Sequence, residues 1–492
     1  MALSRKSDVN PPARDGVPPG TSAHAGQKDP AGAESGQPVR TLHKGGFRQR
    51  HLTMIALGGI IGASLFVGSG SVIHTAGPAA VLSYALGGVL VIFVMRMLGE
   101  MATAKPTLGS FMEYAREALG ERAGFVVGWL YWYFWVGVVA FEAVVGGKLL
   151  GGWFHAPDWV FALVLMFILT ATNLLSARSF GETEFWLASI KVATIIVFLS
   201  VGALVVLGLW PGSQLSVADI GRYGFVVNGG FSILQGVVVV IFSYFGAEIV
   251  TMAAAESEHP AKAVAKATNT VLWRILIFYV GSVALLLMIT PWTEIPSNSS
   301  PFAAAFDKFG LPAAEQIMNI VVLTAALSVL NSGLYTASRM LFALANRGWA
   351  PNWTKDCNSR GVPWKAILLS TIVGYVAVAM NYVSPDRVFS FIMNSAGAVA
   401  LFVYVIIALS QLSLRSRMTD DERTMLGLKM WLHPWLGIVT VVGIVVIIFS
   451  MSLIEATRPQ LWLSLVSLGV LLVAYSVAQW VRRRARTSPL RS

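Results

Sequence analysis

The chain has 492 residues, of which 55% are hydrophobic and only 12% are charged. Soluble globular proteins carry about 25% charged residues, and an apolar content this high cannot be hidden from water at this length. The net charge of +11 does not indicate nucleic-acid binding, because the basic residues lie between apolar stretches and not on one face of a soluble domain. The composition therefore predicts an all-α membrane protein in contact with lipid.

Twelve stretches are apolar and long enough to be predicted as transmembrane helices. They lie near residues 51–76, 79–104, 123–149, 158–177, 185–209, 231–257, 268–291, 313–345, 365–383, 386–413, 434–455 and 460–481. Residues 1–45 are polar and rich in Gly and Pro, which predicts a disordered tail before a membrane domain at 46–482; residues 483–492 form a second short tail. The segment 106–122 is too polar to span and is expected to lie along the inner surface as a short amphipathic helix.

The distribution of Lys and Arg predicts the orientation of the chain. With the N-terminus in the cytoplasm, most basic residues fall in cytoplasmic tails, loops and helix ends, as the positive-inside rule requires. The exceptions are five residues on the outer side and one inside a helix: Lys148, Arg222, Lys308, Arg387, Arg458 and Lys191. We therefore expect a multi-pass protein of the cell (plasma) inner membrane with both termini in the cytoplasm.

Two of the predicted helices, the first and the sixth, contain residues that weaken a helix near mid-membrane. The first contains the run Gly58-Gly59-Ile60-Ile61-Gly62-Ala63-Ser64, and the sixth contains Ser243-Tyr244-Phe245-Gly246-Ala247-Glu248. Breaks at matching positions of two five-helix halves are typical of transporters built from inverted repeats. The pattern predicts one repeat at about 51–209, a second at about 231–413 and two further helices at about 434–481. The alternative is that the glycines only allow helices to pack closely.

The two predicted breaks together offer a binding site for a zwitterion. In the first helix, N–H groups of Ala63, Ser64 and Leu65 at the start of the outer half would bind a carboxylate. In the sixth, carbonyls of Phe242, Ser243 and Phe245 would accept hydrogen bonds from a cation. Ile60, Gly62 and Gly246 complete the predicted site. A small amino acid carries both of these charges.

Ionisable and polar residues within membrane helices are further candidates for function. Lys191 in the fifth helix is a candidate proton carrier, although a lysine there can also extend to the cytoplasmic headgroups. Glu248 either takes part in proton movement or complements the start of the inner half of the sixth helix. Glu142 either approaches the substrate ammonium or makes a structural pair. Asn331 and Ser332 in the eighth helix either meet Lys191 or hold helices together.

Other chemistries find no support in the residue pattern. The seven His and one Cys lack metal-ligand spacing, and there is no phosphate-binding G-x-x-x-x-G-K-[ST] loop or catalytic grouping of Ser, His and Asp. We expect no cofactor, no bound metal and no enzymatic activity. The expected partners are an amino acid, protons and membrane lipid.

Several motifs resemble the amino acid transporter family of the amino acid–polyamine–organocation superfamily. They are Gly59-Ile60-Ile61-Gly62-Ala63-Ser64-Leu65-Phe66, Ala76-Gly77-Pro78, Leu98-Gly99-Glu100-Met101, Glu184-Phe185-Trp186 with Ile190-Lys191, Phe242-Ser243-Tyr244-Phe245-Gly246 and Asn331-Ser332-Gly333-Leu334-Tyr335. The resemblance covers about residues 40–480. It implies two inverted five-helix repeats plus two helices, substrate at the two breaks, and Lys191 as the proton-coupling residue.

Within that family the chain resembles GABA permeases. The features in common are Ala63-Ser64 in the first helix, Glu248-Ile249-Val250-Thr251 with Ala253-Ala254-Ala255-Glu256-Ser257, Ala267-Thr268-Asn269, and Met430-Trp431-Leu432-His433-Pro434-Trp435-Leu436. The function implied is proton-coupled uptake of GABA (4-aminobutyrate) by alternating access. The alternatives are a permease for proline, asparagine or an aromatic amino acid, and a non-transporting amino acid sensor.

Overall fold

The computed structural model describes residues 47–59, 61–210, 224–295, 300–311, 313–383 and 397–487. In these ranges the regular structure is helical, apart from one isolated β-bridge between Phe47 and Ser257. The predicted tail at 1–45, Ile60, Arg222 and residues 384–396, which include Arg387 and most of the first half of the predicted tenth helix, lie outside the described residues. The all-α class predicted from the sequence is confirmed.

The described part of the chain contains ten stretches that are long and apolar enough to cross a membrane. These stretches are Gly68–Ala104, Glu121–Phe154, Asp158–Leu175, Ala177–Val206, Gly230–Ala255, Pro260–Ile289, Ala314–Asn346, Val399–Ser416, Trp435–Leu453 and Arg458–Arg484. Helix α15 (Trp364–Val383) contains a shorter apolar stretch, Trp364–Met380.

The helices of the first half of the chain are α1 (Gln49–Gly58), α2 (Ala63–Phe66), α3 (Gly68–Ala76), α4 (Ala80–Ala104), α5 (Phe111–Leu119), α6 (Glu121–Phe154), α7 (Asp158–Leu175) and α8 (Ala177–Val206). A 3₁₀ turn at Gly77–Ala79 joins α3 to α4. The predicted amphipathic segment forms α5, which buries five of its nine residues (Phe111, Met112, Tyr114, Ala115 and Ala118).

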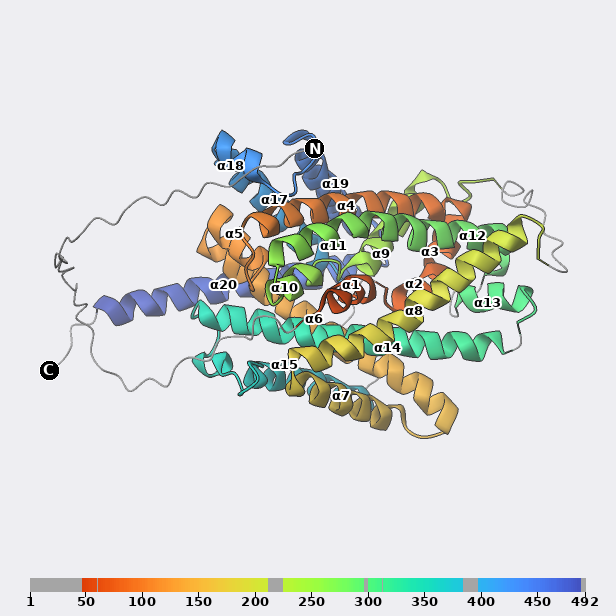
Figure 1. Ribbon diagram of the computed structural model, residues 1–492, viewed down its shortest axis with the longest axis horizontal. Coiled ribbons are helices and arrows are strands. Elements are labelled where there is room, and N and C mark those ends of the chain that lie inside the picture. Colours follow the sequence, from red (N-terminus) through yellow and green to blue (C-terminus); the bar gives the residue numbers. More distant parts are fainter. Residues whose placement is uncertain are drawn as a thin grey trace, which may run out of the picture. The chain divides into compact units, whose positions relative to one another are not determined.

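The second half contains α9 (Gly230–Tyr244), α10 (Ile249–Ala255), α11 (Pro260–Arg274), a π-helix (Ile275–Gly281), α12 (Ser282–Ile289), α13 (Pro301–Lys308), α14 (Ala314–Asn346), α17 (Val399–Ser416), α18 (Asp420–Met425), α19 (Trp435–Leu453) and α20 (Arg458–Thr487). Short 3₁₀ turns lie at Trp292–Glu294 and Asn352–Lys355. In Figure 1, α4, α11 with α12, and α14 run nearly parallel, and α8 crosses them at an angle.

Several helices extend beyond their predicted bounds, and α11 and α20 are two examples. The seventh predicted helix starts at 268, whereas α11 starts at Pro260, and the last ends at 481, whereas α20 continues through Arg482 to Thr487. Hydropathy marks where a helix is in contact with lipid, but polar helix ends continue the backbone pattern into water. Pro at the first helical position and Arg and Ala near the end are all compatible with helix.

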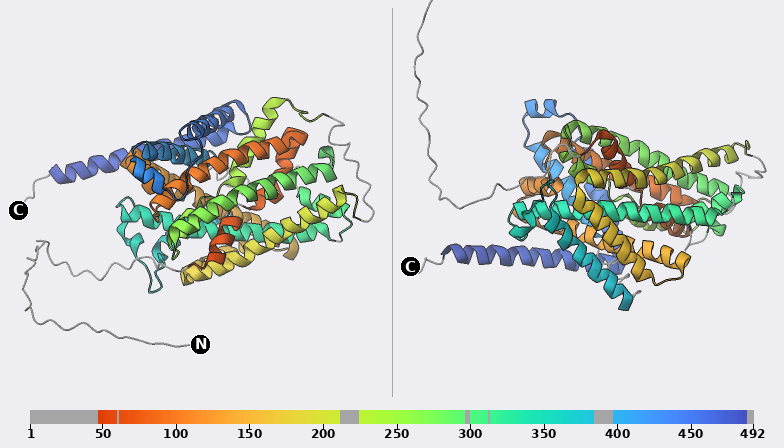
Figure 2. Two further views of the ribbon diagram at one scale, coloured as in Figure 1. Left: turned by 45° about the horizontal axis from the view of Figure 1, so that its top comes forward. Right: turned by 60° about the horizontal axis from the view of Figure 1, so that its bottom comes forward.

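Helices α6 and α14 form the centre of the bundle and pack along each other. At 34 and 33 residues, each is about 50 Å long at 1.5 Å per residue, which exceeds the roughly 30 Å of a bilayer core. Gly333 permits their close approach, because a Cβ there would lie 2.8 Å from Val139 Cγ2 on α6. The short helix α1 contacts α8 and α11 and lies between them in the left view of Figure 2.

The two predicted helix interruptions are confirmed. Helix α1 ends at Gly58 and α2 begins at Ala63; α9 ends at Tyr244 and α10 begins at Ile249. Gly246 has a φ of 115°, and a Cβ there would overlap the carbonyl oxygen of Gly59. The two breaks therefore touch, at a position whose conformation and close approach both favour glycine.

Candidate functional site

A cavity of about 420 Å³ lies where the two helix breaks meet. Six of the residues predicted at the two breaks line it: Gly62, Ala63, Ser64, Phe242, Ser243 and Phe245. Helix α6 contributes Trp135 and Glu142, and α14 contributes Val329. Leu65 and Gly246 are not among its lining residues, and Ile60 lies outside the described residues. The structure thus brings together most of the residues that the sequence predicts at the two breaks.

At the first break, two of the three predicted N–H donors are available. The N–H groups of Ala63 and Ser64 have no acceptor among the described residues, whereas the N–H of Leu65 donates to the Gly62 carbonyl at 3.3 Å. Leu65 is also fully buried, so the structure does not support its predicted role as a donor. Val67 keeps a helical backbone between α2 and α3, so the helix dipole of Ala63–Ala76 adds positive potential at these donors.

At the second break, two of the three predicted carbonyls already accept hydrogen bonds. The Phe242 carbonyl accepts from the Phe245 N–H at 3.3 Å, and the Ser243 carbonyl accepts from Tyr279 Oη at 3.2 Å. The carbonyl of Phe245 has no donor within the described ranges. The ring of Phe245 packs against Phe134, with centroids 4.5 Å apart, and closes one wall of the cavity. Of the three predicted carbonyls, that of Phe245 is thus the one available to accept hydrogen bonds from a cation.

Lys191 is fully buried and holds the first break from both sides. Its Nζ donates to the Gly58 carbonyl at 2.7 Å, to the Ile61 carbonyl at 2.6 Å and to Ser328 Oγ at 2.8 Å. These bonds use all three N–H donors of a protonated lysine. The side chain therefore does not extend to the headgroups, which rules out one of the two interpretations left open by the sequence.

A chain of polar side chains continues from Lys191 across the bundle. The Ser328 hydroxyl donates to Glu184 Oε1, and Asn331 Nδ2 donates to Glu184 Oε2 at 3.2 Å. Asn173 Nδ2 on α7 donates in turn to Asn331 Oδ1 at 2.9 Å. We call Lys191, Ser328, Glu184, Asn331 and Asn173 the lysine network. All five side chains are buried.

The lysine network differs in part from the sequence prediction. Asn331 reaches Lys191 only through Glu184 and Ser328, and the hydroxyl of Ser332 has no partner among the described residues. Ser328 and Glu184 are not among the site residues predicted from the sequence. Helical periodicity carries the signal for both, because Ser328 lies one turn from Asn331 and Glu184 lies two turns from Lys191 on the same face.

Glu142 places a carboxylate in the wall of the cavity. Its side chain is only 6% exposed, and Oε2 has no hydrogen-bond partner in the part of the chain that the structure describes. Burying an unpaired carboxylate is costly unless a partner arrives. Of the two interpretations from the sequence, the geometry favours contact with a bound cation over a structural pair.

Glu248 lies at the inner side of the second break and stabilises the backbone there. Its Oε2 accepts from the Gly246 N–H at 3.0 Å, and its Oε1 accepts from Tyr131 Oη at 2.9 Å. It is also the residue that precedes α10. The carboxylate satisfies an N–H at the break but makes no capping hydrogen bond to α10, so the interpretation that it complements the start of the inner half-helix stays a prediction.

Below the breaks, several contacts join the inner ends of the helices, and we call them the inner contacts. Arg339 Nε on α14 lies 3.1 Å from Glu256 Oε1, which also accepts from Tyr335 Oη at 2.8 Å. Arg50 and His51 on α1 contact Glu182 on α8. The rings of Phe180 and Tyr335 stack with centroids 4.2 Å apart, and Phe47 packs on both. These contacts close the bundle on this side of the cavity.

Comparison with known proteins identifies the family of the chain. The sequence model of the family described as amino acid permease matches residues 51–488. The gamma-aminobutyric acid permease of Bacillus subtilis is 50% identical over 90% of this chain and 96% of its own length, and that of Escherichia coli is 43% identical over 87% and 92%. The aromatic amino acid transport protein of Corynebacterium glutamicum is 38% identical over 87% and 94%. This chain therefore belongs to the amino acid permease family.

Proposed function

We propose that this permease takes up GABA into the cytoplasm together with protons. Two relatives that match most of the chain at 43–50% identity are gamma-aminobutyric acid permeases, which supports GABA as the substrate. The observation that carries the proposal is the cavity at the two breaks, where N–H donors on one side and a carboxylate oxygen and a carbonyl on the other have no partner among the described residues.

In this proposal the membrane domain covers residues 46–482 and has twelve spanning helices. Helices α1 to α8 form one five-helix repeat (about 51–209), α9 to α17 form a second of opposite orientation (about 231–413), and α19 and α20 are additional. Tails at 1–45 and 483–492 lie in the cytoplasm, and the domain lies in the plasma (inner) membrane. The positions of the two breaks and the distribution of Lys and Arg support this arrangement.

The two charged ends of GABA match the two polar ends of the cavity. The carboxylate would accept hydrogen bonds from the N–H groups of Ala63 and Ser64, with the Ser64 hydroxyl adjacent. The ammonium would donate to the Phe245 carbonyl and to Glu142. Apolar residues such as Val138 and Val329 line the space between and suit the methylene groups. Gly62 and Gly246 keep the backbone at the breaks accessible, and Ile60 remains an untested member of the predicted site.

Lys191 is the proposed proton-coupling residue because its charge state determines how many bonds hold the first break. A neutral amine has only two N–H donors, so loss of the proton would release one of the Gly58, Ile61 and Ser328 acceptors. A change in protonation would therefore loosen the break that binds the carboxylate. Glu184 and Asn331 would hold the lysine in place through Ser328.

Alternating access would require the inner contacts to separate. Opening towards the cytoplasm would part Arg339 from Glu256 and the α1 residues Arg50 and His51 from Glu182. A membrane potential of 100 mV supplies about 2.3 kcal/mol for each charge moved inwards. One pH unit adds about 1.4 kcal/mol, so a single proton supports a substrate gradient of a few hundredfold, since each 1.4 kcal/mol is tenfold.

A second candidate is uptake of another amino acid, such as an aromatic amino acid, proline or asparagine. The 38% identity to an aromatic amino acid transport protein is the observation in its favour. The lower identity of that relative favours GABA. Glu142 does not discriminate, because each of these amino acids carries a cationic amine. Family membership does not favour the third possibility, an amino acid sensor that does not transport.

Uptake of labelled GABA into proteoliposomes with an imposed inward proton gradient tests the proposal. We expect accumulation that a protonophore abolishes and that unlabelled GABA inhibits more strongly than phenylalanine, proline or asparagine. If GABA does not compete while phenylalanine does, the substrate assignment is wrong. If GABA accumulates equally without the gradient, the proton coupling is wrong and the substrate assignment stands.

A further inference from the structure

A second cavity, of about 590 Å³, lies between the start of α6 and the end of α20. None of its lining residues belongs to either helix break. It is lined by Gly120, Glu121 and Arg122 on one side and by Tyr475, Trp480 and Arg483 on the other. We call it the α6–α20 groove. Nothing in the proposed transport cycle uses it. Its lining combines basic and aromatic side chains, which are the residue types that meet lipid headgroups at membrane surfaces.

The α20 residues of the groove lie on one face of a helix that is otherwise exposed. Tyr475, Gln479 and Arg483 are spaced by four residues and therefore share a face, with Trp480 beside them. Only 11% of the apolar window of α20 is buried, so most of this helix is available to lipid. At 30 residues it is about 45 Å long, which carries its final turns beyond a hydrocarbon core of roughly 30 Å.

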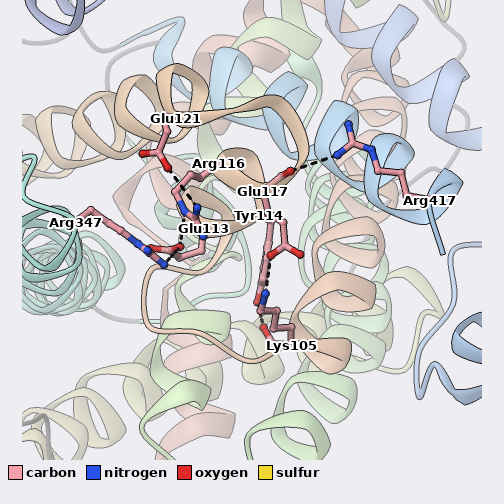
Figure 3. A network of polar contacts seen from close by, with 8 residues as sticks. All are labelled: Lys105, Glu113, Tyr114, Arg116, Glu117, Glu121, Arg347 and Arg417. Carbon is pink, nitrogen blue, oxygen red and sulfur yellow. Dashed lines mark hydrogen bonds and ion pairs between the residues drawn. The ribbon is translucent and has the colours of Figure 1, made fainter. Parts of the chain in front are cut away.

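Acidic residues near the groove are already paired, and Figure 3 shows how they are arranged around α5. Glu121 Oε1 lies 3.3 Å from Arg116 Nη1, and Glu117 Oε2 lies 2.7 Å from Lys105 Nζ. Glu113 is held by Arg116 and Arg347. Although Glu121 lines the groove, its charge is offset by Arg116, which is not a lining residue. The groove therefore keeps a positive potential.

Arg122 is placed to use that potential. Its guanidinium lies 5.8 Å from the centroid of the Tyr475 ring, and the described residues give it no acidic partner. The N–H groups of Glu121 and Arg122 are at the start of α6, where a helix offers no internal acceptor. A Cβ on Gly120 would meet nothing within 4 Å, so the backbone at this corner is open to a ligand.

We propose that the α6–α20 groove binds the phosphate headgroup of an anionic phospholipid. The phosphate would accept hydrogen bonds from the Arg122 guanidinium, whose fork of N–H donors matches phosphate oxygens, and from the first N–H groups of α6. Trp480 and Tyr475 would lie at the level of the glycerol backbone, and the acyl chains would follow the exposed face of α20. Arg483 adds a second positive charge to the groove.

Native mass spectrometry of the purified protein with phosphatidylglycerol or phosphatidylcholine tests this site. We expect preferential retention of phosphatidylglycerol, about fivefold weaker in Arg122→Gln, since one arginine near a membrane surface contributes about 1 kcal/mol. Arg122→Lys keeps the charge but lacks the fork of N–H donors. We expect it to retain phosphatidylglycerol more weakly than the original protein and more strongly than Arg122→Gln. Arg178→Gln, which removes an exposed charge at the start of α8 outside the groove, is the matched control and should bind as the original protein does.

Three results would overturn the proposal. Equal retention of the two lipids would exclude a site for anionic headgroups. Equal losses in Arg122→Gln and Arg178→Gln would indicate only general surface charge. Displacement of phosphatidylglycerol by millimolar inorganic phosphate would indicate a phosphate site and not a lipid site. An unchanged melting temperature of Arg122→Gln in phosphatidylcholine would show that the variant folds, so that its loss of lipid is interpretable. None of these readouts depends on transport.

Discussion

The central cavity and the lysine network both contact the first helix break and differ in how their polar groups are paired. In the cavity, the N–H groups of Ala63 and Ser64, the Phe245 carbonyl and Glu142 Oε2 all lack partners among the described residues. In the lysine network, every donor of Lys191 is used, and both carboxylate oxygens of Glu184 accept hydrogen bonds.

The difference suggests that the cavity binds a ligand and that the lysine network supports the backbone of the first break. Buried polar groups without partners are costly, so a protein retains them where a ligand completes them. The hydrogen bonds of Lys191 and Glu184 instead fix the geometry of the backbone, here the carbonyls on both sides of the first break, although Asn173 Oδ1 at the end of the network has no partner among the described residues. The cavity is therefore the part expected to tolerate a change of substrate, whereas the lysine network is expected to tolerate little change of any kind.

The largest effect is expected for Lys191→Ala. The substitution leaves the Gly58 and Ile61 carbonyls and Ser328 without their shared donor, and each unsatisfied buried group costs about 1–3 kcal/mol. We expect uptake to fall by about tenfold or more and the residual uptake to lose its dependence on an imposed pH gradient. Lys266→Ala, which removes an exposed lysine on α11, is the control. Gradient dependence that survives in Lys191→Ala would show that the lysine is only structural.

A smaller effect, confined to the substrate, is expected for Glu142→Gln. Loss of a charge-assisted hydrogen bond worth about 1.5–3 kcal/mol should raise the KM for GABA by tenfold or more. Inhibition by butanoate, which keeps the carboxylate and lacks the ammonium, should not weaken. Glu315→Gln changes an exposed carboxylate on α14 and should leave KM unaltered. If GABA and butanoate are affected equally, Glu142 does not contact the ammonium, and the contrast between cavity and network is weakened.

The smallest effect is expected among the inner contacts, for Arg50→Gln. Its pair with Glu182 is half exposed, and water and salt screen such pairs so that they contribute little to stability. Thermal unfolding in detergent should show a shift of a few degrees at most. Arg339→Gln removes a partner of the buried Glu256 and should lower the unfolding temperature much more, because breaking a buried pair costs about 3–5 kcal/mol. Similar shifts for both variants would mean that burial does not distinguish these pairs.

Residue-level prediction succeeded where the signal is local. Glycines in an apolar run mark places where a helix is weak, and the breaks at Gly58–Gly62 and at Gly246 are present. Prediction failed where a partner is distant in sequence. Nothing near Lys191 indicates that its hydrogen bonds go to Gly58, Ile61 and Ser328, which are more than a hundred residues away. Leu65 is a different case, because the acceptor of its N–H is the carbonyl of Gly62, only three residues away at the start of α2.

By itself, the sequence determined that the chain is a helical membrane protein and where two of its helices break. Apolar residues favour a helix in contact with lipid, and glycine weakens a helix through backbone entropy. Both effects depend on residues that are close together in the sequence. Only the tertiary structure decided that the breaks touch, that Glu142 Oε2 lies in a cavity wall without a partner among the described residues, and that Lys191 holds both sides of one break. Those properties depend on how helices pack across the bundle, which sequence spacing within one helix does not specify.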